Sequence, residues 1–214
     1  YKVSEQVFLN AYDFIGQHFF YIQPENDKPT PEYIRQRFLE LIIKEKINGC
    51  VIDPHNQLAH DYNKSGRTDE YLEQVFGDYA RFAKLNDVCF FIVAHPKQLK
   101  KQANGNYECP DVFDLAGGAM WNNKMDNILV YHKPFAQSDP NNPTCEFHSK
   151  KIRRRKASGK PGFIDFVYNF KTRRFEFNGG DPMQAAMTKL KLDFHAPVTN
   201  FTPCLLYTSD AADD

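Results

Sequence analysis

The chain has 214 residues, which is enough for one ordinary domain with an appendage and for a real hydrophobic core. Its hydrophobic fraction is 42% and its formal net charge is zero, so a claim of nucleic-acid binding has to rest on local charge. No apolar stretch approaches the roughly 20 residues of a membrane span, and without a start Met or signal peptide we expect a piece of a longer protein.

The first half of the chain alternates short apolar runs with amphipathic segments. The aromatic run at 18–22 predicts a strand. The next segment predicts a helix with Thr30 as its N-cap, Pro31 in its first turn and Gly49 at its end. Residues 50–53 predict a second strand.

A second helix is predicted to open at Thr68, and a continuous apolar strand follows at 88–95. Such a continuous run is typical of a strand covered on both faces. The helix has one apolar face, formed by Leu72, Val75, Phe76, Tyr79, Phe82 and Leu85. A loop and a short helix then lead to a strand at 128–132, and residues 144–156 and 161–170 predict two antiparallel strands.

Strands that alternate with amphipathic helices predict an α/β fold, with a mostly parallel, helix-covered sheet and an antiparallel end. Such sheets bind ligands at the carboxyl ends of their strands, so we expect Asp53 and His95 to line one crevice. The pattern weakens beyond residue 178. We expect a partial domain at 1–178, a C-terminal extension at 179–203 and a non-native tail at 204–214, which resembles a translated sequencing adapter.

The cysteines are scattered and include no CxxC pair: Cys50, Cys89, Cys109, Cys145 and Cys204. An odd, dispersed set of cysteines indicates reduced intracellular thiols. It argues against disulfides and against a zinc site.

Asp53 ends a hydrophobic strand, the position of a carboxylate that holds Mg²⁺ at the phosphates of a nucleotide. Many α/β strands also end in an aspartate that only caps a turn. A rival interpretation combines Asp53 with His55, His60 and Asp61 as a hydrolytic metal centre. Both histidines lie in one polar loop, without ligand-spaced partners elsewhere, which disfavours the rival.

His95 is followed by a basic loop that contains glycines. A polar side chain at a strand end can hydrogen-bond a terminal phosphate and report its loss to the next loop. The loop adds candidate contacts to nucleic-acid phosphates: Lys97, Lys100, Lys101, Gly117 and Gly118. A lone histidine favours a capping role, and a lone glycine pair favours a turn. Together they are typical of an NTP-driven machine that grips nucleic acid.

The stretch KKIRRRKASGK contains no acidic residue. Alternate residues of a strand face opposite sides, which gives two basic groups: Lys151, Arg153 and Arg155, and Lys150, Arg154 and Lys156. One face could reach a neighbouring subunit's nucleotide as an arginine finger, while the other meets phosphate backbone. The alternative is a solvated basic edge strand that resists edge-to-edge pairing.

The chain resembles the RecA-like motor of ring-shaped replicative helicases in four stretches that occur in order: NGCVIDPHNQL, CFFIVAHPKQLKK, DLAGGAMWNNKMDNILVYHK and HSKKIRRRKASGKPGFIDFVYN. The likeness covers roughly residues 15–178. It is strongest to phage primase–helicases and the mitochondrial Twinkle helicase, with the DnaB helicase more distant. The resemblance implies that Asp53 is the Walker B carboxylate for Mg²⁺, His95 the γ-phosphate sensor, and the segment from Lys97 to Gly118 the DNA-gripping loop.

In this family a Lys-x-Arg on a late strand serves the NTP of the neighbouring subunit. Lys151 and Arg153 match that spacing, and extra residues before GKPG leave Arg154 or Arg155 as alternatives for the arginine finger. The phosphate loop of the family, G-x-x-x-x-G-K-[ST], is absent from the sequence. We expect that loop and the catalytic glutamate upstream, so this chain alone should bind NTP poorly and hydrolyse none.

For the full-length parent, the resemblance implies a homo-oligomeric ring of six subunits that uses ATP or another NTP with Mg²⁺. The ring would pull single-stranded DNA through its channel, with a primase fused or associated and no membrane involved. The expected location is the cytoplasm of a bacterial or phage-infected cell. Two alternatives are a non-hydrolysing RecA-like nucleic-acid-binding module and a RecA-type recombinase ATPase. A phosphate loop upstream in the same frame favours the motor over the binding module.

Overall fold

The computed structural model describes residues 4–25, 28–62, 67–97, 99–189 and 206–207. The helices are α1 (Glu5–His18), α2 (Pro31–Glu45), α3 (Thr68–Asn86), α4 (Gly118–Lys124), α5 (Arg155–Ser158), α6 (Pro182–Lys189) and the 3-10 helices His55–Gln57 and Val112–Asp114. The strands are β1 (Tyr21–Ile22), β2 (Gly49–Ile52), β3 (Cys89–Ile92), β4 (Asn127–His132), β5 (Thr144–Ile152), β6 (Gly162–Asn169), β7 (Arg174–Glu176) and β8 (Leu206–Tyr207).

The chain divides into two compact units. The first unit, which contains β2 and β3, comprises Tyr1–His60, Phe82–Ile92 and Ala186–Asp214. The second unit, which contains β4 to β7, comprises Asp61–Arg81 and Val93–Ala185.

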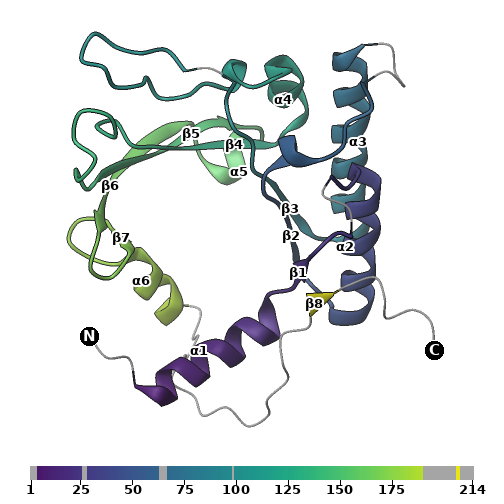
Figure 1. Cartoon of the computed structure of the whole chain (residues 1–214), viewed down its shortest axis with the longest axis horizontal. Coiled ribbons are helices and arrows are strands. Elements are labelled where there is room, and N and C mark those ends of the chain that lie inside the picture. The colour runs from purple at the N-terminus through teal and green to yellow at the C-terminus, as the bar shows by residue number, and fades with distance from the viewer. Residues whose placement is uncertain (1–3, 26–27, 63–66, 98, 190–205, 208–214) are drawn as a thin grey trace. The chain divides into compact units, whose positions relative to one another are not determined.

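In the first unit, β2 and β3 pair in parallel, and α2 lies beside them (Figure 1). Phe38 of α2 meets Phe90 of β3 edge to face, with ring centroids 5.6 Å apart. Cys50, which pairs with Phe90, is buried on the same side. The opposite side carries Val51 and Phe91, which are 57% and 51% exposed. The prediction of a strand covered on both faces is therefore wrong for the described residues, because α2 covers only one face.

The boundaries in this unit follow local capping. The Thr30 hydroxyl accepts a hydrogen bond from the Tyr33 N–H at 3.1 Å, as its predicted N-cap role requires. The helix ends before the predicted Gly49, because Lys46 adopts a left-handed conformation with φ of 58°. The predicted strand at 18–22 shortens to β1 because α1 continues to His18.

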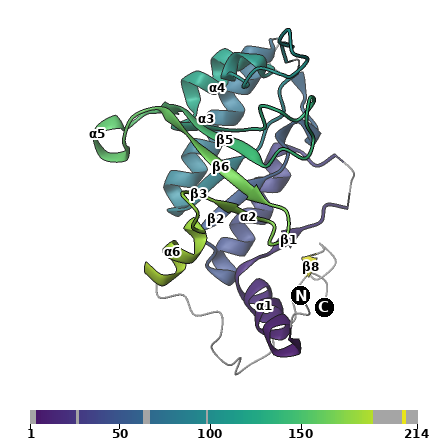
Figure 2. The same ribbon diagram turned by 90° about the vertical axis from the view of Figure 1, so that its left-hand side faces the viewer.

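In the second unit, β4, β5, β6 and β7 form an antiparallel sheet in that order. The predicted antiparallel pair is confirmed as β5 and β6, and Figure 2 shows α5 at the tip of their hairpin. However, β5 ends at Ile152 and a short helix starts at Arg155. The predicted strand alternation is therefore wrong beyond Ile152, since the helical turn at the tip replaces the extended backbone.

The apolar face of α3 supplies the core of the second unit. Its buried residues are Tyr71, Leu72, Val75, Phe76 and Tyr79. The Phe76 ring lies 4.4 Å from the Trp121 ring of α4, and the Trp121 indole N–H donates to the Ala116 carbonyl at 3.0 Å. Leu85 was predicted on this face but is 76% exposed, because the buried stripe ends before the last turn of the helix.

The predicted α/β class with parallel and antiparallel strands is confirmed, although the antiparallel part is larger than expected. The parallel pairs are β2–β3 and β1–β8. The extension predicted at 179–203 includes α6, while residues 190–203 lie outside the described residues. No helix in the described part of the chain is long and apolar enough to cross a membrane.

Candidate functional site

Asp53 directly follows β2, and its side chain is exposed. Ile52 pairs with Ile92 in parallel register, so β2 and β3 end at the same edge. This is the carboxyl edge, where α/β sheets bind ligands. Among the described residues no group hydrogen-bonds or ion-pairs with the Asp53 carboxylate. It therefore caps no described turn, and it is free to bind a ligand.

His95 lies three residues beyond the end of β3, and its side chain is exposed. It belongs to the second unit, whereas Asp53 belongs to the first. The crevice shared by Asp53 and His95 therefore stays a prediction.

The loop that follows His95 folds back on itself. Its first residue, Lys97, donates its backbone N–H to the Asp114 carbonyl at 2.9 Å. Within the loop Lys101 pairs with Tyr107 in an isolated β-bridge, and the Lys101 ammonium lies 5.5 Å from the Tyr107 ring centroid. The loop presents three exposed ammonium groups: Lys97, Lys100 and Lys101. A folded loop with exposed cations suits contact with nucleic-acid phosphates.

Asn106 holds this loop in place, although no sequence pattern singles it out. Asn106 is 2% exposed. Its Oδ1 accepts from the backbone N–H groups of Gln137 at 3.2 Å and Ser138 at 3.0 Å, and its Nδ2 donates to Ser138 Oγ at 2.9 Å. All three bonds reach a segment more than 30 residues away, so no local motif could reveal them.

Gly117 and Gly118 are required by the packing at the start of α4. Gly117 has a φ of 70°, and a Cβ there would collide with Leu72 Cδ1. A Cβ on Gly118 would lie 2.6 Å from Phe113 Cα and 2.6 Å from the Val112 carbonyl oxygen. The Gly118 N–H also donates to the Leu115 carbonyl at 3.2 Å. The glycine pair thus has a packing reason, and the Gly118 N–H is already used within the chain.

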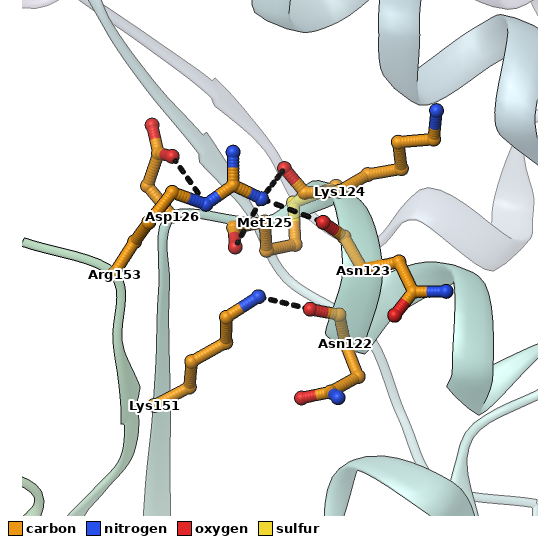
Figure 3. Close-up of polar contacts among 7 residues, drawn as sticks. All are labelled: Asn122, Asn123, Lys124, Met125, Asp126, Lys151 and Arg153. Carbon is orange, nitrogen blue, oxygen red and sulfur yellow. Dashed lines mark hydrogen bonds and ion pairs between the residues drawn. The ribbon is translucent and has the colours of Figure 1, made fainter.

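Lys151 and Arg153 bind the C-terminal end of α4 (Figure 3). The Lys151 ammonium donates to the Asn122 carbonyl. The Arg153 guanidinium donates to the next three carbonyls and pairs with a carboxylate: Asn123 at 2.6 Å, Lys124 at 3.3 Å, Met125 at 3.4 Å and Asp126 at 3.2 Å. The last carbonyls of a helix lack intrahelical partners and carry the negative end of its dipole. The two cations therefore cap α4.

The electrostatics at Lys151 agree with this position. Burial lowers the pKa of Lys151, the Arg153 charge lowers it further, and Asp126 opposes both. In contrast, Arg154 and Arg155 are exposed near the hairpin tip, and no described residue forms an ion pair with either side chain. The basic stretch thus contains two cations held in place and two that are free.

The rival metal centre does not form among the described residues. His55 is 4% exposed, and its ring lies 4.6 Å from the His60 ring. His60 Nε2 lies 3.0 Å from the His55 carbonyl, so that nitrogen carries a proton and cannot bind a metal. Burial, with His60 nearby, lowers the pKa of His55 to about 4. In the described part of the chain, neither the two histidines nor Asp53 belongs to a group of three converging ligand atoms.

Comparisons with known proteins agree with the fold. No family model matches the chain. The Twinkle homolog protein, chloroplastic/mitochondrial, of Arabidopsis thaliana is 28% identical over 157 residues, which cover 73% of this chain. The match covers 22% of that protein, so the chain spans less than a quarter of the length of its curated relative.

Two solved structures share the fold. The first, an ATPase domain, has a TM-score of 0.52 at 17% identity, and the match covers 69% of this chain and 51% of that one. The second, a DnaB-like replicative helicase studied for its interactions with primase, has a TM-score of 0.53 at 18% identity, and the match covers 70% of this chain and 35% of that one. The resemblance to the RecA-like motor domain of replicative helicases is thereby confirmed.

Proposed function

We propose that this chain is the back half of an NTP-dependent replicative DNA helicase motor. The observation that carries the proposal is Asp53, exposed and without a described partner, at the carboxyl edge of the parallel β2–β3 pair. The likeness to the Twinkle homolog protein over 157 residues supports the same assignment.

Asp53 would hold Mg²⁺ at the phosphates of ATP or another NTP. The residue suits the ion because a hard cation prefers carboxylate oxygens, and this carboxylate has no competing described partner. When bound, Mg²⁺ neutralises charge on the phosphates. The phosphate loop and the base that activates water would come from sequence upstream, in a ring of six subunits that also works with a primase.

The DNA-binding part would be the loop from Lys97 to Gly118. The hydrogen bond from Lys97 to Asp114 joins its two ends, and Asn106 anchors its middle. A loop closed in this way moves as one piece, so a γ-phosphate contact at His95 could shift its lysines together. Single-stranded DNA would lie against these lysines.

The arginine finger would be Arg154 or Arg155. Lys151 and Arg153, which match the family spacing, could reach a neighbouring nucleotide only by leaving the carbonyls of α4. Arg154 and Arg155 have no such contacts to break among the described residues.

The test begins with the upstream reading frame on the source DNA and the full-length product. We expect a phosphate loop in that frame and NTP hydrolysis stimulated by DNA. Asp53→Asn should lower hydrolysis about 100-fold or more, because metal stabilisation of phosphoryl charge is worth several kcal/mol. Asp61→Asn is the matched control and should retain activity. The rival metal centre requires Asp61, so it predicts that this variant loses activity as well. His95→Ala should remove the DNA stimulation.

Two results would overturn the motor assignment. Full activity in Asp53→Asn would show that Asp53 is not the Mg²⁺ carboxylate. A wild-type protein that binds DNA in a salt-sensitive way but hydrolyses no NTP would be a RecA-like binding module instead. An intact motor core without an upstream primase domain would be compatible with a RecA-type recombinase. A strand-unwinding assay then distinguishes a helicase from a recombinase.

The role of the loop is tested by the salt dependence of DNA binding. Changing Lys97, Lys100 and Lys101 together to Gln should lower the slope of log affinity against log salt by about 2, since each phosphate contact on single strands contributes about 0.7. The control changes three exposed lysines outside the loop: Lys44, Lys46 and Lys84. Equal slopes in the two triple variants would contradict the assignment.

A further inference from the structure

One face of the antiparallel sheet carries side chains of the types that bind metals. Glu146 and His148 are two residues apart on β5, so both point to the same face. His132 of β4 pairs with Glu146, and Phe163 of β6 pairs with His148, which places both partners on that face. The His148 ring stacks on the Phe163 ring, with centroids 5.0 Å apart and planes at 18°. This stacking fixes the plane of the imidazole.

Cys109 reaches this face from the loop that Asn106 anchors. Its Sγ, a carboxylate oxygen of Glu146 and a ring nitrogen of His148 all lie within 4.8 Å of one another, and the three residues are half-buried. His148 Nε2 lies 2.7 Å from Glu146 Oε2. Within the described ranges, these three residues are the group whose side chains could together hold a metal ion.

We propose that Cys109, Glu146 and His148 form a binding site for one zinc-class divalent ion. Zinc takes sulfur, nitrogen and oxygen ligands at about 2.0–2.3 Å, which places the ligand atoms of a tetrahedral site roughly 3.3–3.8 Å apart. Small side-chain adjustments convert the observed spacing to that geometry. The ion would replace the hydrogen bond between His148 and Glu146 and leave a fourth position for water. The thiolate disfavours Mg²⁺ and Ca²⁺, which prefer oxygen.

The surroundings suit such an ion. Burial raises the pKa of the Cys109 thiol, whereas the charge and hydrogen bond of Lys150 lower it and so oppose that effect in favour of the thiolate that a metal requires. His132 is 9% exposed and lies opposite Glu146, so it can hydrogen-bond groups around the ion. Sequence reasoning missed the site because Cys109 lies in a loop and its partners lie on a strand 37 and 39 residues later.

An ion here would fasten the loop to the sheet at Cys109, between Lys97 and Gly118. If that loop binds DNA, the presence or absence of the metal ion would control how firmly the loop is held. This consequence rests on the proposed function, but the metal site does not.

The experiment uses the untagged chain and Co²⁺ as the probe, followed by Zn²⁺. We expect about one Co²⁺ to bind per chain and to give a near-ultraviolet sulfur-to-cobalt charge-transfer band. The band should disappear when Zn²⁺ replaces Co²⁺. Cys109→Ser should abolish the band. Substitutions of residues that only hydrogen-bond a metal ligand weaken metal binding by about 10–100-fold. His148→Gln removes a ligand itself and should weaken Zn²⁺ binding by more than that.

Matched controls separate this site from other thiols and histidines. Cys89→Ser replaces an exposed thiol in the first unit, and His60→Gln replaces a member of the rival pair; both should leave the band unchanged. Circular dichroism verifies folding, and Glu146→Gln tests the site if Cys109→Ser does not fold. No band in the wild-type chain, or a band that survives Cys109→Ser, overturns the proposal. The assay contains no NTP or DNA, so its result is independent of the helicase assignment.

Discussion

Asp53 in the first unit and Arg153 in the second unit are candidate residues held in opposite ways. In the first unit, Asp53 is exposed and has no described partner, and the adjoining sheet face with Val51 and Phe91 is open. In the second unit, Arg153 contacts three carbonyls and a carboxylate, and the Asn106 side chain makes three hydrogen bonds. No described contact holds Asp53, whereas contacts within the second unit hold Arg153 and leave its neighbours Arg154 and Arg155 free.

The difference determines what a substitution measures. Changing a free residue such as Asp53 should alter ligand binding with little effect on folding. Changing a held residue such as Arg153 removes contacts that stabilise the fold, so lost activity would not by itself show a catalytic role. Stability and activity must therefore be measured together in the second unit.

The largest expected effect is in the core of the second unit. Phe76→Ala should lower the free energy of unfolding by about 4 kcal/mol, because a buried phenylalanine costs about 3–5 kcal/mol when truncated. Phe76 is 1% exposed and packs against Trp121. Urea denaturation followed by fluorescence of Trp121, the single tryptophan, measures the change.

The control for Phe76→Ala is Phe91→Ala on the open face of β3. Its ring is 51% exposed, so the expected loss is below about 1 kcal/mol. Hydrogen exchange should show lost protection in α4 for Phe76→Ala and unchanged protection in α2 for Phe91→Ala. Equal losses from the two substitutions would contradict the distinction between the open and the packed region.

Local patterns predicted α2, α3, β2 and β6 but not α1, because helix caps and apolar periods are encoded by neighbouring residues only where those signals are present. Thr30 and Pro31 marked the start of α2, and the apolar run before Asp53 marked β2. The candidate position of Asp53 followed from the same logic, since a strand end is a local feature.

The sequence could not predict the contacts that join distant segments. Nothing near Arg153 indicates that it caps α4, because its acceptors lie 28 to 30 residues earlier. Nor does the run of basic residues show that β5 ends at Ile152, since lysine and arginine occur in strands and helical turns alike. The three bonds of Asn106 are hidden for the same reason.

An intermediate effect is expected from the pH dependence of His55 in the first unit. The pKa of His55 falls from 6.5 to about 4 because burial disfavours the charged ring. Its neutral form therefore contributes stability that is complete above pH 6.5 and is lost as pH falls toward 4, where the unfolded chain binds more protons. Between those pH values the loss should be about 3 kcal/mol.

The measurement compares urea unfolding of the wild type and His55→Gln across this pH range. The wild-type curve should fall more steeply, and the two curves should converge at low pH. His18→Gln replaces an exposed histidine in the same unit and should follow the wild-type curve. Parallel curves for wild type and His55→Gln would show that His55 is not held neutral by burial.

The smallest effect separates the held from the free arginines. Arg153→Ala should cost about 1 kcal/mol, since it removes charge-assisted hydrogen bonds to the C-terminal carbonyls of α4 from a side chain that is 46% exposed. Arg155→Ala should change stability by less than about 0.5 kcal/mol, because no described residue pairs with it. If Arg155 contacts the nucleotide of the neighbouring subunit in the full-length protein, Arg155→Ala should lower NTP hydrolysis more than Arg153→Ala does, the reverse of their order in stability. A variant that loses hydrolysis without losing stability acts on the nucleotide, whereas one that loses both in proportion acts through α4.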